Sequence, residues 1–413
     1  MSKPMGPIPA EFSAGPDGVL RIGDRSAEAL ATEAGGTPLF VYDAELVAAR
    51  IARLHAVFPG ISLHYAIKAN SYAPLLSFIS KQVDGLDVAS AGEMRLALAA
   101  GTDPADISFA GPGKRDSEIA GALEAGVTLN LESEGEAERA LAAADALGVR
   151  PRLAIRVNPD FEIKGSGMRM GGGAKPFGVD AERVPALVRR LLDAGAEWRG
   201  FHIFAGSQAL SAEALIEAQR ATVALAGRLA EEAGAGPPLV NLGGGFGIPY
   251  FHGEQPLDVE AVGEALAVTL ADRPLILRDS AFAIELGRWL VGEAGVYLTR
   301  IVDRKVSHGK TFLVTDGGMH HQLAASGNFG QVVRRNFPVA IASRFAAPAE
   351  EDASIVGCLC TPLDRLADDV AAPAAQVGDL VAVFLAGAYG LSASPQAFLG
   401  HEPARELLVN APA

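Results

Sequence analysis

Residues 85–101 read GLDVASAGEMRLALAAG, and this stretch contains the pattern that decides the fold. A short β-rich run ends in Ser90, and a segment rich in Ala, Leu, Glu and Arg follows, as is typical of a helix. The same order recurs along the chain. Eight strand candidates share this form: SLHYAIK (62–68), GLDVAS (85–90), ISFAGP (107–112), TLNLES (128–133), RLAIRVNP (152–159), GFHIFAGS (200–207), LVNLGGG (239–245) and FAIELGR (282–288). Strands that alternate with helices predict parallel pairing.

Repeated β-α units are compatible with an open doubly wound sheet or with a closed (β/α)₈ barrel. The span 39–290 matches the length of a barrel, which is about 250 residues. We therefore predict an α/β fold with a barrel domain over residues 39–290. In such a barrel the chemistry lies at the C-terminal ends of the strands.

The pattern changes after residue 290. Residues 294–319 predict two long strands around a polar turn at Ser307–Lys310, and residues 352–364 and 378–390 predict further strands without helices between them. We interpret residues 291–413 as a β-rich, barrel-like second domain. The first 38 residues contain short apolar runs and are expected to add strands to it.

Composition excludes several classes of protein. The chain has 413 residues, of which 49% are hydrophobic and 20% charged, so it can bury a large core. Its 35 Lys and Arg against 49 Asp and Glu give a formal charge of −14, which argues against nucleic acid and anionic membranes as main partners. The two cysteines, Cys358 and Cys360, cannot form a disulfide framework, and residues 1–12 contain no apolar segment of a secretory signal. We expect a cytoplasmic protein.

One uncharged stretch, residues 380–400, is long enough to cross a bilayer. Gly, Ser and Pro interrupt it, and its apolar character fades after Leu391. We interpret it as a short buried strand, LVAVFLA, followed by a loop.

Several strand candidates end in residues that could carry chemistry. Lys68 closes the first strand, where it could extend to solvent at the barrel rim or be a desolvated amine that forms a Schiff base with an aldehyde. Asp87 could cap the next helix or belong to a site. His202 could be a structural residue or stack on a flat heterocycle. Glu285 lies in an apolar strand and needs a partner, either a structural arginine or a protonated ring nitrogen.

The strand that ends in Gly243, Gly244 and Gly245 could form a tight turn or a phosphate-binding nest of backbone N–H groups. It lacks the third glycine of a dinucleotide fingerprint. Ser207, after the strand with His202, could also hold an anion. A Schiff-base lysine, a stacking histidine, a phosphate nest and a carboxylate for a ring nitrogen together describe a pyridoxal 5'-phosphate site.

At this point the sequence resembles the fold type III pyridoxal phosphate-dependent decarboxylases, the group of diaminopimelate and ornithine decarboxylases. The matching motifs are HYAIKAN (64–70), GLDVASAGE (85–93), GFHIFAGSQ (200–208), NLGGGFG (241–247), ELGR (285–288), CTPLD (360–364) and GAYG (387–390). Within the group, it is most similar to the branch that contains the butirosin decarboxylase, which acts on a glutamyl group held on an acyl-carrier protein, and the decarboxylases associated with exosortase A loci. The motifs for this branch are MRMGGG (168–173), GGGFGIPYF (243–251), DGGMHH (316–321) and LCTPLD (359–364).

The resemblance implies a role for each matching residue. Lys68 would form the Schiff base, His202 would stack on the ring, Glu285 would pair with the ring nitrogen, and Asp87 would support the ring. The phosphate would be held by Ser207, Gly243, Gly244, Gly245, Gly287, Arg288 and Tyr389. Cys360 would enter the site from the second subunit of a homodimer and face the substrate, beside Thr361, Asp364 and Tyr389. We expect Lys68, Cys360, Glu285 and His202 to be the catalytic residues.

Two positions depart from the pattern of the group. Leu286 replaces a usual proline, which matters little because the backbone of the next two residues does the binding. Thr361 stands where decarboxylases that recognise a distal ammonium group carry Asp or Glu. This makes diaminopimelate, lysine and ornithine less favoured substrates than one with a neutral, anionic or carrier-bound distal end. Arg334 and Arg335 could meet such an anion or the phosphate arm of a carrier, or could be ordinary surface residues.

The favoured interpretation is an enzyme that removes the α-carboxylate of an amino acid or of a carrier-bound, glutamyl-like group. Glu285 favours decarboxylation over racemisation, for which a cation at the ring nitrogen is expected. The alternatives are diaminopimelate decarboxylase and a non-catalytic protein that binds pyridoxal phosphate. His320 and His321, close to Asp316, suggest a metal, but without a third convergent ligand we expect no metal site.

Overall fold

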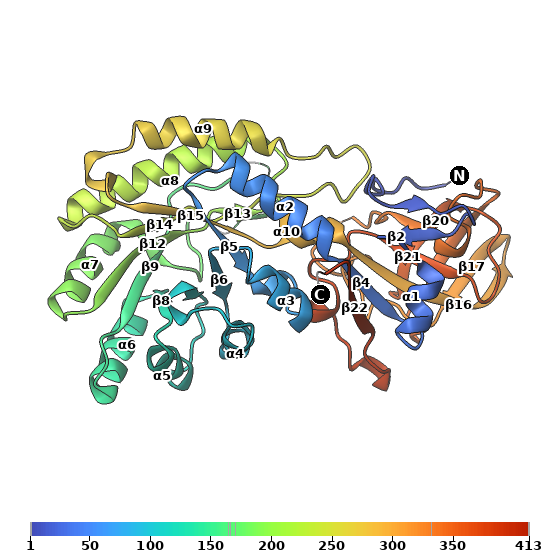
Figure 1. The fold of residues 1–413 in the computed structure, drawn as a ribbon, viewed down its shortest axis with the longest axis horizontal. Helices are drawn as coiled ribbons and strands as arrows, with labels where there is room; N and C mark the ends of the chain where they lie inside the picture. Colours follow the sequence, from blue (N-terminus) through green and yellow to red (C-terminus); the bar gives the residue numbers. More distant parts are fainter. Residues whose placement is uncertain (1, 164, 166, 170, 332, 412–413) are drawn as a thin grey trace. The chain divides into compact units, whose positions relative to one another are not determined.

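The computed structural model describes residues 2–163, 165, 167–169, 171–331 and 333–411 (Figure 1). The described residues form two compact units. One comprises Ala48–Ile248 and Pro256–Gly287, and the other comprises Met1–Val47, Pro249–Gln255 and Arg288–Ala413. We call them the barrel unit and the β-rich unit.

In the described part of the barrel unit, parallel strands form a closed ring. They are β5 (Ser62–Ala66), β6 (Gly85–Val88), β7 (Ile107–Phe109), β8 (Thr128–Leu131), β9 (Arg152–Asn158), β12 (Glu197–Ile203), β14 (Leu239–Asn241) and β15 (Ala281–Leu286). Their order is β9-β12-β14-β15-β5-β6-β7-β8, and the pairing of β8 with β9 closes the ring. The prediction of a closed barrel rather than an open sheet is therefore confirmed. A short strand, β11 (Val179–Asp180), adds to β9.

Helices follow most of these strands and lie around the barrel in Figure 1. They are α3 (Ala73–Ile79), α4 (Ala91–Ala99), α5 (Asp116–Ala125), α6 (Glu134–Leu147), α7 (Val184–Asp193), α8 (Ala212–Ala233) and α9 (Val259–Ala271), with α2 (Ala44–Val57) before β5. Side-chain caps explain where several begin. The Ser90 hydroxyl accepts the Glu93 N–H at 3.1 Å, and the Ser133 hydroxyl accepts the Glu136 N–H at 3.1 Å. Ser90 rather than Asp87 therefore caps α4.

The β-rich unit contains a larger sheet and a small separate one. The large sheet runs β18-β21-β16-β17-β19-β20, and β4 joins β16 to β22. These strands are β4 (Leu39–Asp43), β16 (Gly295–Ser307), β17 (Lys310–Thr315), β18 (Val339–Ile341), β19 (Glu351–Val356), β20 (Arg365–Ala372), β21 (Leu380–Val383) and β22 (Arg405–Val409). The expected turn joins β16 to β17, with positive φ at both His308 and Gly309, as a tight hairpin requires. Two short helices, α1 (Ala27–Glu33) and α10 (Arg288–Val291), belong to this unit.

One domain expectation needs correction. The sequence pattern places residues 39–43 in the barrel, but they form β4, which pairs antiparallel with β16 and parallel with β22 in the β-rich unit. Hydrogen bonds between distant segments decide this assignment, and a local pattern does not contain them. The N-terminal strands β1 (Ser13–Ala14), β2 (Leu20–Ile22) and β3 (Arg25–Ser26) lie in the β-rich unit, as expected, where they form the small separate sheet.

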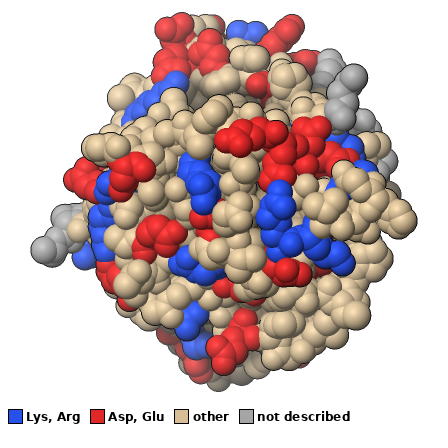
Figure 2. All heavy atoms as spheres, turned by 90° about the vertical axis from the view of Figure 1, so that its right-hand side faces the viewer, with Lys and Arg blue, Asp and Glu red and all other residues tan. Residues whose placement is uncertain are grey.

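The uncharged stretch at 380–400 forms β21, followed by turns and short 3₁₀ helices. No helix among the described residues has both the length and the apolar character that a membrane span needs. On the face shown in Figure 2, Lys and Arg are interspersed with Asp and Glu.

Candidate active site

Glu285, His202, Asp87 and Lys68 lie in or directly after strands of the barrel unit. One detail differs from expectation, because β5 ends at Ala66 and Lys68 lies in a short 3₁₀ helix, η1 (Ile67–Ala69). The lysine is therefore in the turn beyond the strand. This position leaves 46% of its side chain exposed, while Glu285 is only 6% exposed.

The Glu285 carboxylate holds two basic groups. Its Oε1 lies 3.5 Å from the Lys68 Nζ, and its Oε2 lies 2.8 Å from the His202 Nε2. Burial alone would raise the pKa of Glu285, but the charge of Lys68, the hydrogen bond from His202 and the charge of Arg156 hold it well below its usual range. The carboxylate is thus ionised, and a basic nitrogen placed against it is stabilised in its protonated form.

His202 is buried on β12, and Glu285 determines which of its nitrogens carries a proton. An ionised carboxylate only accepts hydrogen bonds, so the His202 Nε2 donates. The other ring nitrogen, Nδ1, is buried and has no hydrogen-bond partner in the described part of the chain. The imidazole is therefore held at one edge by the same carboxylate that faces Lys68.

Asp87 on β6 lies beside His64 on β5, with 3.5 Å between the Asp87 Oδ2 and the His64 Nδ1. Burial opposes the charged imidazolium, but the charges of Asp87, Glu285 and Asp84 outweigh it and raise the pKa of His64. The sequence motif HYAIKAN contained His64, yet nothing local indicated that it would face Asp87.

The glycine segment after β14 is packed too closely for side chains. A Cβ at Gly244 would lie 1.9 Å from the carbonyl oxygen of Glu285, and one at Gly243 would lie 2.6 Å from that of Ile203. Gly243 and Gly245 also have φ of +67° and +85°. The Asn241 Oδ1 accepts the Gly243 N–H at 2.8 Å and fixes the start of the turn. The close packing against neighbouring carbonyl groups and the positive φ values explain why this turn consists of glycines.

Ser207 and Gly287 follow the strands β12 and β15, which both pair with β14 in the barrel unit. Ser207 belongs to the short strand β13 (Gly206–Ser207), which pairs with β10 (Met168–Arg169), and Ser207 is half-buried. Gly287 directly follows the strand that contains Glu285, and a Cβ there would lie 2.7 Å from the Cβ of Ala69. Ser207 therefore supplies a hydroxyl at this place, while Gly287 has no room for a side chain.

Within the β-rich unit, Arg288 and Tyr389 lie together. The Arg288 guanidinium carbon is 4.5 Å from the centroid of the Tyr389 ring, and its Nη1 donates to the Tyr250 hydroxyl at 2.9 Å. Tyr389 has φ of +53°, a conformation that is uncommon for an aromatic residue and that turns the chain sharply at this point. Burial lowers the pKa of Arg288, but Tyr250 and Tyr389 outweigh it and keep the guanidinium charged.

The loop after β19 contains the residues expected to face the substrate. Cys360 is exposed and Thr361 is half-buried. Asp364 is only 3% exposed, and its two oxygens accept the N–H groups of Met319 at 2.6 Å and Leu359 at 2.8 Å. The expectation that Asp364 contacts the substrate therefore needs correction, because its carboxylate organises the loop.

A buried charge network in the barrel was missed by the sequence analysis. Arg156 on β9 donates to Glu132 at 2.8 Å, and Lys114 donates to Glu136 at 2.6 Å. Glu132 also accepts the N–H groups of Gly111 and Gly178, so it joins three loops at the strand ends. Arg156 lies in the predicted strand RLAIRVNP, but the spacing of residues in the sequence does not show which Lys or Arg side chains will be buried.

The remaining candidates lie in the β-rich unit. Arg335 stacks on Phe251, with 3.6 Å from its guanidinium carbon to the ring centroid, and pairs with Glu254 at 3.2 Å. Arg334 donates to the carbonyl of Arg365 at 2.7 Å. His320 is buried, and burial together with its histidine neighbours lowers its pKa to about 4. In the branch motif MRMGGG, Met170 lies outside the described residues.

The described residues fit pyridoxal phosphate, the cofactor that the resemblance implies. An amine can react with its aldehyde at Lys68, and an ionised buried carboxylate at Glu285 can accept the ring N–H. In the glycine turn, in which no side chain fits, Gly244 is partly exposed, and its backbone could be approached closely by a phosphate.

Comparisons with known proteins agree with this fit. The family described as "Pyridoxal-dependent decarboxylase, pyridoxal binding domain" matches residues 44–292. The chain is 36% identical over 384 residues to the L-glutamyl-(BtrI acyl-carrier protein) decarboxylase of Niallia circulans, covering 90% of this chain and 88% of that protein. It is 32% identical over 403 residues to the diaminopimelate decarboxylase of Methanothermobacter thermautotrophicus, covering 95% and 91%.

Solved structures show the same architecture along the chain. The diaminopimelate decarboxylase of M. jannaschii in complex with L-lysine matches with a TM-score of 0.87 at 27% identity, covering 97% of this chain and 93% of that one. From the site geometry, the matched domain and these relatives, we conclude that the chain belongs to the fold type III pyridoxal-dependent decarboxylases and is an amino-acid carboxy-lyase that uses pyridoxal 5'-phosphate.

Proposed function

We propose that this decarboxylase acts on a glutamyl-like group bound to an acyl-carrier protein. The observation that carries the proposal is the uncharged loop at 357–363, in which Thr361 occupies the position where decarboxylases of a distal ammonium group carry an acid. Its hydroxyl accepts the Leu363 N–H at 3.4 Å and bears no charge. The similarity to a carrier-protein decarboxylase along 90% of the chain supports the same substrate class.

In this proposal, different residues of the chain have different roles in the decarboxylation. Pyridoxal phosphate, when bound, supplies the electron sink for the carbanion that loss of CO2 leaves. Lys68 would hold the cofactor through its side-chain amine until the substrate amine takes its place. Glu285 would hold a proton on the ring nitrogen, because its own ionised form is strongly favoured. In the barrel unit, His202, fixed by Glu285, would pack on the ring, and Ser207, Gly243–Gly245 and Gly287 would bind the phosphate. In the β-rich unit, Arg288 and Tyr389 are the residues expected to bind the phosphate as well.

The proton that quenches the carbanion comes from Cys360 in this proposal. Its thiol is exposed on the loop after β19, as is required of a residue that serves the site of a second subunit. We therefore propose a homodimer with shared active sites. Both cysteines are free, which supports a reduced, cytoplasmic location.

The test is CO2 release by the purified, cofactor-loaded enzyme. The substrates compared are a glutamyl-carrier thioester, free L-glutamate, meso-diaminopimelate, L-ornithine and L-lysine, with Lys68→Ala as the blank. Mass spectrometry of the carrier should show the loss of one CO2 from the thioester and none with the blank. Turnover of diaminopimelate instead would overturn the proposal and assign the enzyme to the second candidate function, which its diaminopimelate decarboxylase relatives represent.

The role of Cys360 is tested by mixing two inactive variants. Cys360→Ala and Lys68→Ala should each lose most activity, because each removes one part of every site. If the sites are shared, mixed dimers contain one intact site and recover part of the activity. Recovery does not occur if each chain supplies its own Cys360.

A further inference from the structure

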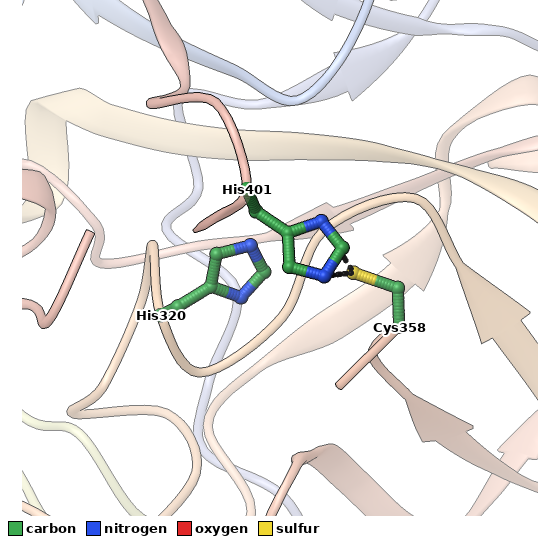
Figure 3. Close-up of side chains that lie close together, drawn as sticks. All are labelled: His320, Cys358 and His401. Carbon is green, nitrogen blue, oxygen red and sulfur yellow. Dashed lines mark hydrogen bonds between the residues drawn. The ribbon is translucent and has the colours of Figure 1, made fainter. Parts of the chain in front are cut away.

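His320, Cys358 and His401 converge in the β-rich unit, outside the residues that serve decarboxylation. Each of the three side chains offers one potential metal-ligand atom, and these three atoms all lie within 4.8 Å of one another. The Cys358 Sγ lies 3.9 Å from both ring nitrogens of His401, and the rings of His320 and His401 are 5.0 Å apart between centroids. Figure 3 shows the three side chains directed toward one another.

The fold brings these residues together from three separate loops. His320 follows β17 and Cys358 follows β19, and these two strands run parallel, so that their ends lie at the same edge of the sheet. His401 precedes β22. The convergence depends on strand pairing, and no sequence spacing indicates it.

The state of His320 points to a ligand. Its side chain is fully buried at 0% exposure, and neither ring nitrogen has a hydrogen-bond partner among the residues that the structure describes. A buried polar group without a partner is unfavourable, and its presence needs an explanation. The next residue offers a direct comparison, because His321 has both nitrogens occupied, by the Tyr297 hydroxyl at 3.2 Å and by the Glu402 carbonyl at 2.9 Å.

Nearby carboxylates are already used by the protein. Asp364 binds backbone N–H groups, and Asp316 accepts hydrogen bonds from Thr299 and from the Arg300 N–H. The potential metal ligands that remain at this place are therefore imidazole nitrogens and the Cys358 thiol, whose Sγ donates to the carbonyl oxygen of Asp316 at 3.6 Å. These ligands select Zn²⁺ and similar transition metals over Mg²⁺ and Ca²⁺, which prefer oxygen.

We propose that His320, Cys358 and His401 form a zinc site with a fourth position open to water or to another ligand. Zinc lies about 2.3 Å from sulfur and about 2.0–2.1 Å from nitrogen, which places tetrahedral ligand atoms about 3.3–3.6 Å apart. The observed separations need to contract by roughly 1 Å, which side-chain rotation can supply. Because each ligand comes from a different loop, the metal would join the loop of Cys360 and Thr361 to the loop that begins with Asp316.

The first test measures zinc in the holoenzyme after removal of metal with a chelator, addition of ZnCl2 and dialysis. We expect one zinc per chain, and at least a tenfold loss of bound zinc in His320→Ala, Cys358→Ser and His401→Ala. Cys360→Ser and His308→Ala serve as matched controls and should keep the metal. Cofactor absorbance shows whether each variant is folded. Absence of zinc from the wild type, or an equal loss in the controls, would overturn the proposal.

A second test uses the wild type alone and does not depend on how the variants fold. Zinc should slow alkylation of Cys358 at least tenfold, while Cys360, two residues away, should react at an unchanged rate, as mapped by mass spectrometry. Equal rates at Cys358 with and without zinc would refute the site. Co²⁺ should give a thiolate charge-transfer band that Cys360→Ser retains and Cys358→Ser lacks.

Discussion

The Nε2 of His202 lies 2.8 Å from the Oε2 of Glu285. The Glu285 carboxylate therefore contacts two basic side chains, those of His202 and Lys68. The His202 side chain is 5% exposed and the Glu285 side chain is 6% exposed, so water has little access to their contact. The relationship explains how an acid in an apolar strand remains ionised. In the proposed function, Glu285 is the residue on which protonation of the cofactor ring depends.

Replacing Glu285 with glutamine should lower decarboxylation by roughly 100-fold, the order found when one preorganised electrostatic contact is removed. The amide keeps the shape of the side chain but cannot hold the ring nitrogen protonated. The measurement is kcat with the preferred substrate, with cofactor content monitored by absorbance. Glu264→Gln, at an exposed position on α9, is the control. Full turnover by Glu285→Gln would show that the charge is not needed.

Stability should depend on pH through His64. Its pKa in the folded protein lies above the ordinary value of 6.5, so folding favours the imidazolium. The stabilisation is therefore complete below about pH 6.5 and is lost as the pH rises through the folded pKa. Thermal unfolding between about pH 6 and about pH 9 should show this decline in the wild type and a flatter profile in His64→Gln. His55→Gln, at an exposed position on α2, should keep the wild-type slope; identical slopes in all three proteins would contradict the assignment.

Gly244→Ala should abolish or greatly weaken cofactor binding. The new methyl group would lie 1.9 Å from the carbonyl oxygen of Glu285, so the glycine turn must shift away from its position. Gly113→Ala tests the same substitution at a position where a Cβ meets nothing within 4 Å. Cofactor affinity by fluorescence titration should fall at least tenfold in the first variant and stay unchanged in the second. Equal affinities would mean that the turn tolerates a side chain.

Removing one partner of the buried ion pair between Lys114 and Glu136 should strongly lower the stability of the folded protein. Their side chains are 1% and 2% exposed and 2.6 Å apart, so Lys114→Met leaves a buried carboxylate without its counter-ion. We expect a loss of about 3–5 kcal/mol in the free energy of unfolding, measured by urea denaturation. The double variant Lys114→Met, Glu136→Leu should recover much of the loss.

The exposed pair of Arg183 and Glu134 provides the comparison for this measurement. Its side chains are 51% and 44% exposed, so Arg183→Met should cost less than about 1 kcal/mol. Similar costs for the two single variants would show that burial does not control the strength of these ion pairs.

The sequence by itself determined the barrel strands and pointed to Lys68, His202 and Glu285, which the structure brings into contact. Buried parallel strands read as short apolar runs, and serines such as Ser90 that follow them are helix caps. Lys68, His202 and Glu285 could be assigned to strand ends on one side of the barrel because parallel strands have their C-terminal ends on the same side. These features are local or repeat regularly, and they therefore appear in a linear pattern.

The tertiary structure alone decided the features that depend on distant segments. Residues 39–43 belong to the β-rich unit because β4 bonds to β16 and β22, far away in the sequence. Asp364 became a structural residue because the N–H groups of two loops meet at its carboxylate. His320, Cys358 and His401 meet because β17 and β19 are parallel neighbours. Strand pairing between distant segments leaves no periodic trace in the sequence, which is why these contacts became visible only in the folded chain.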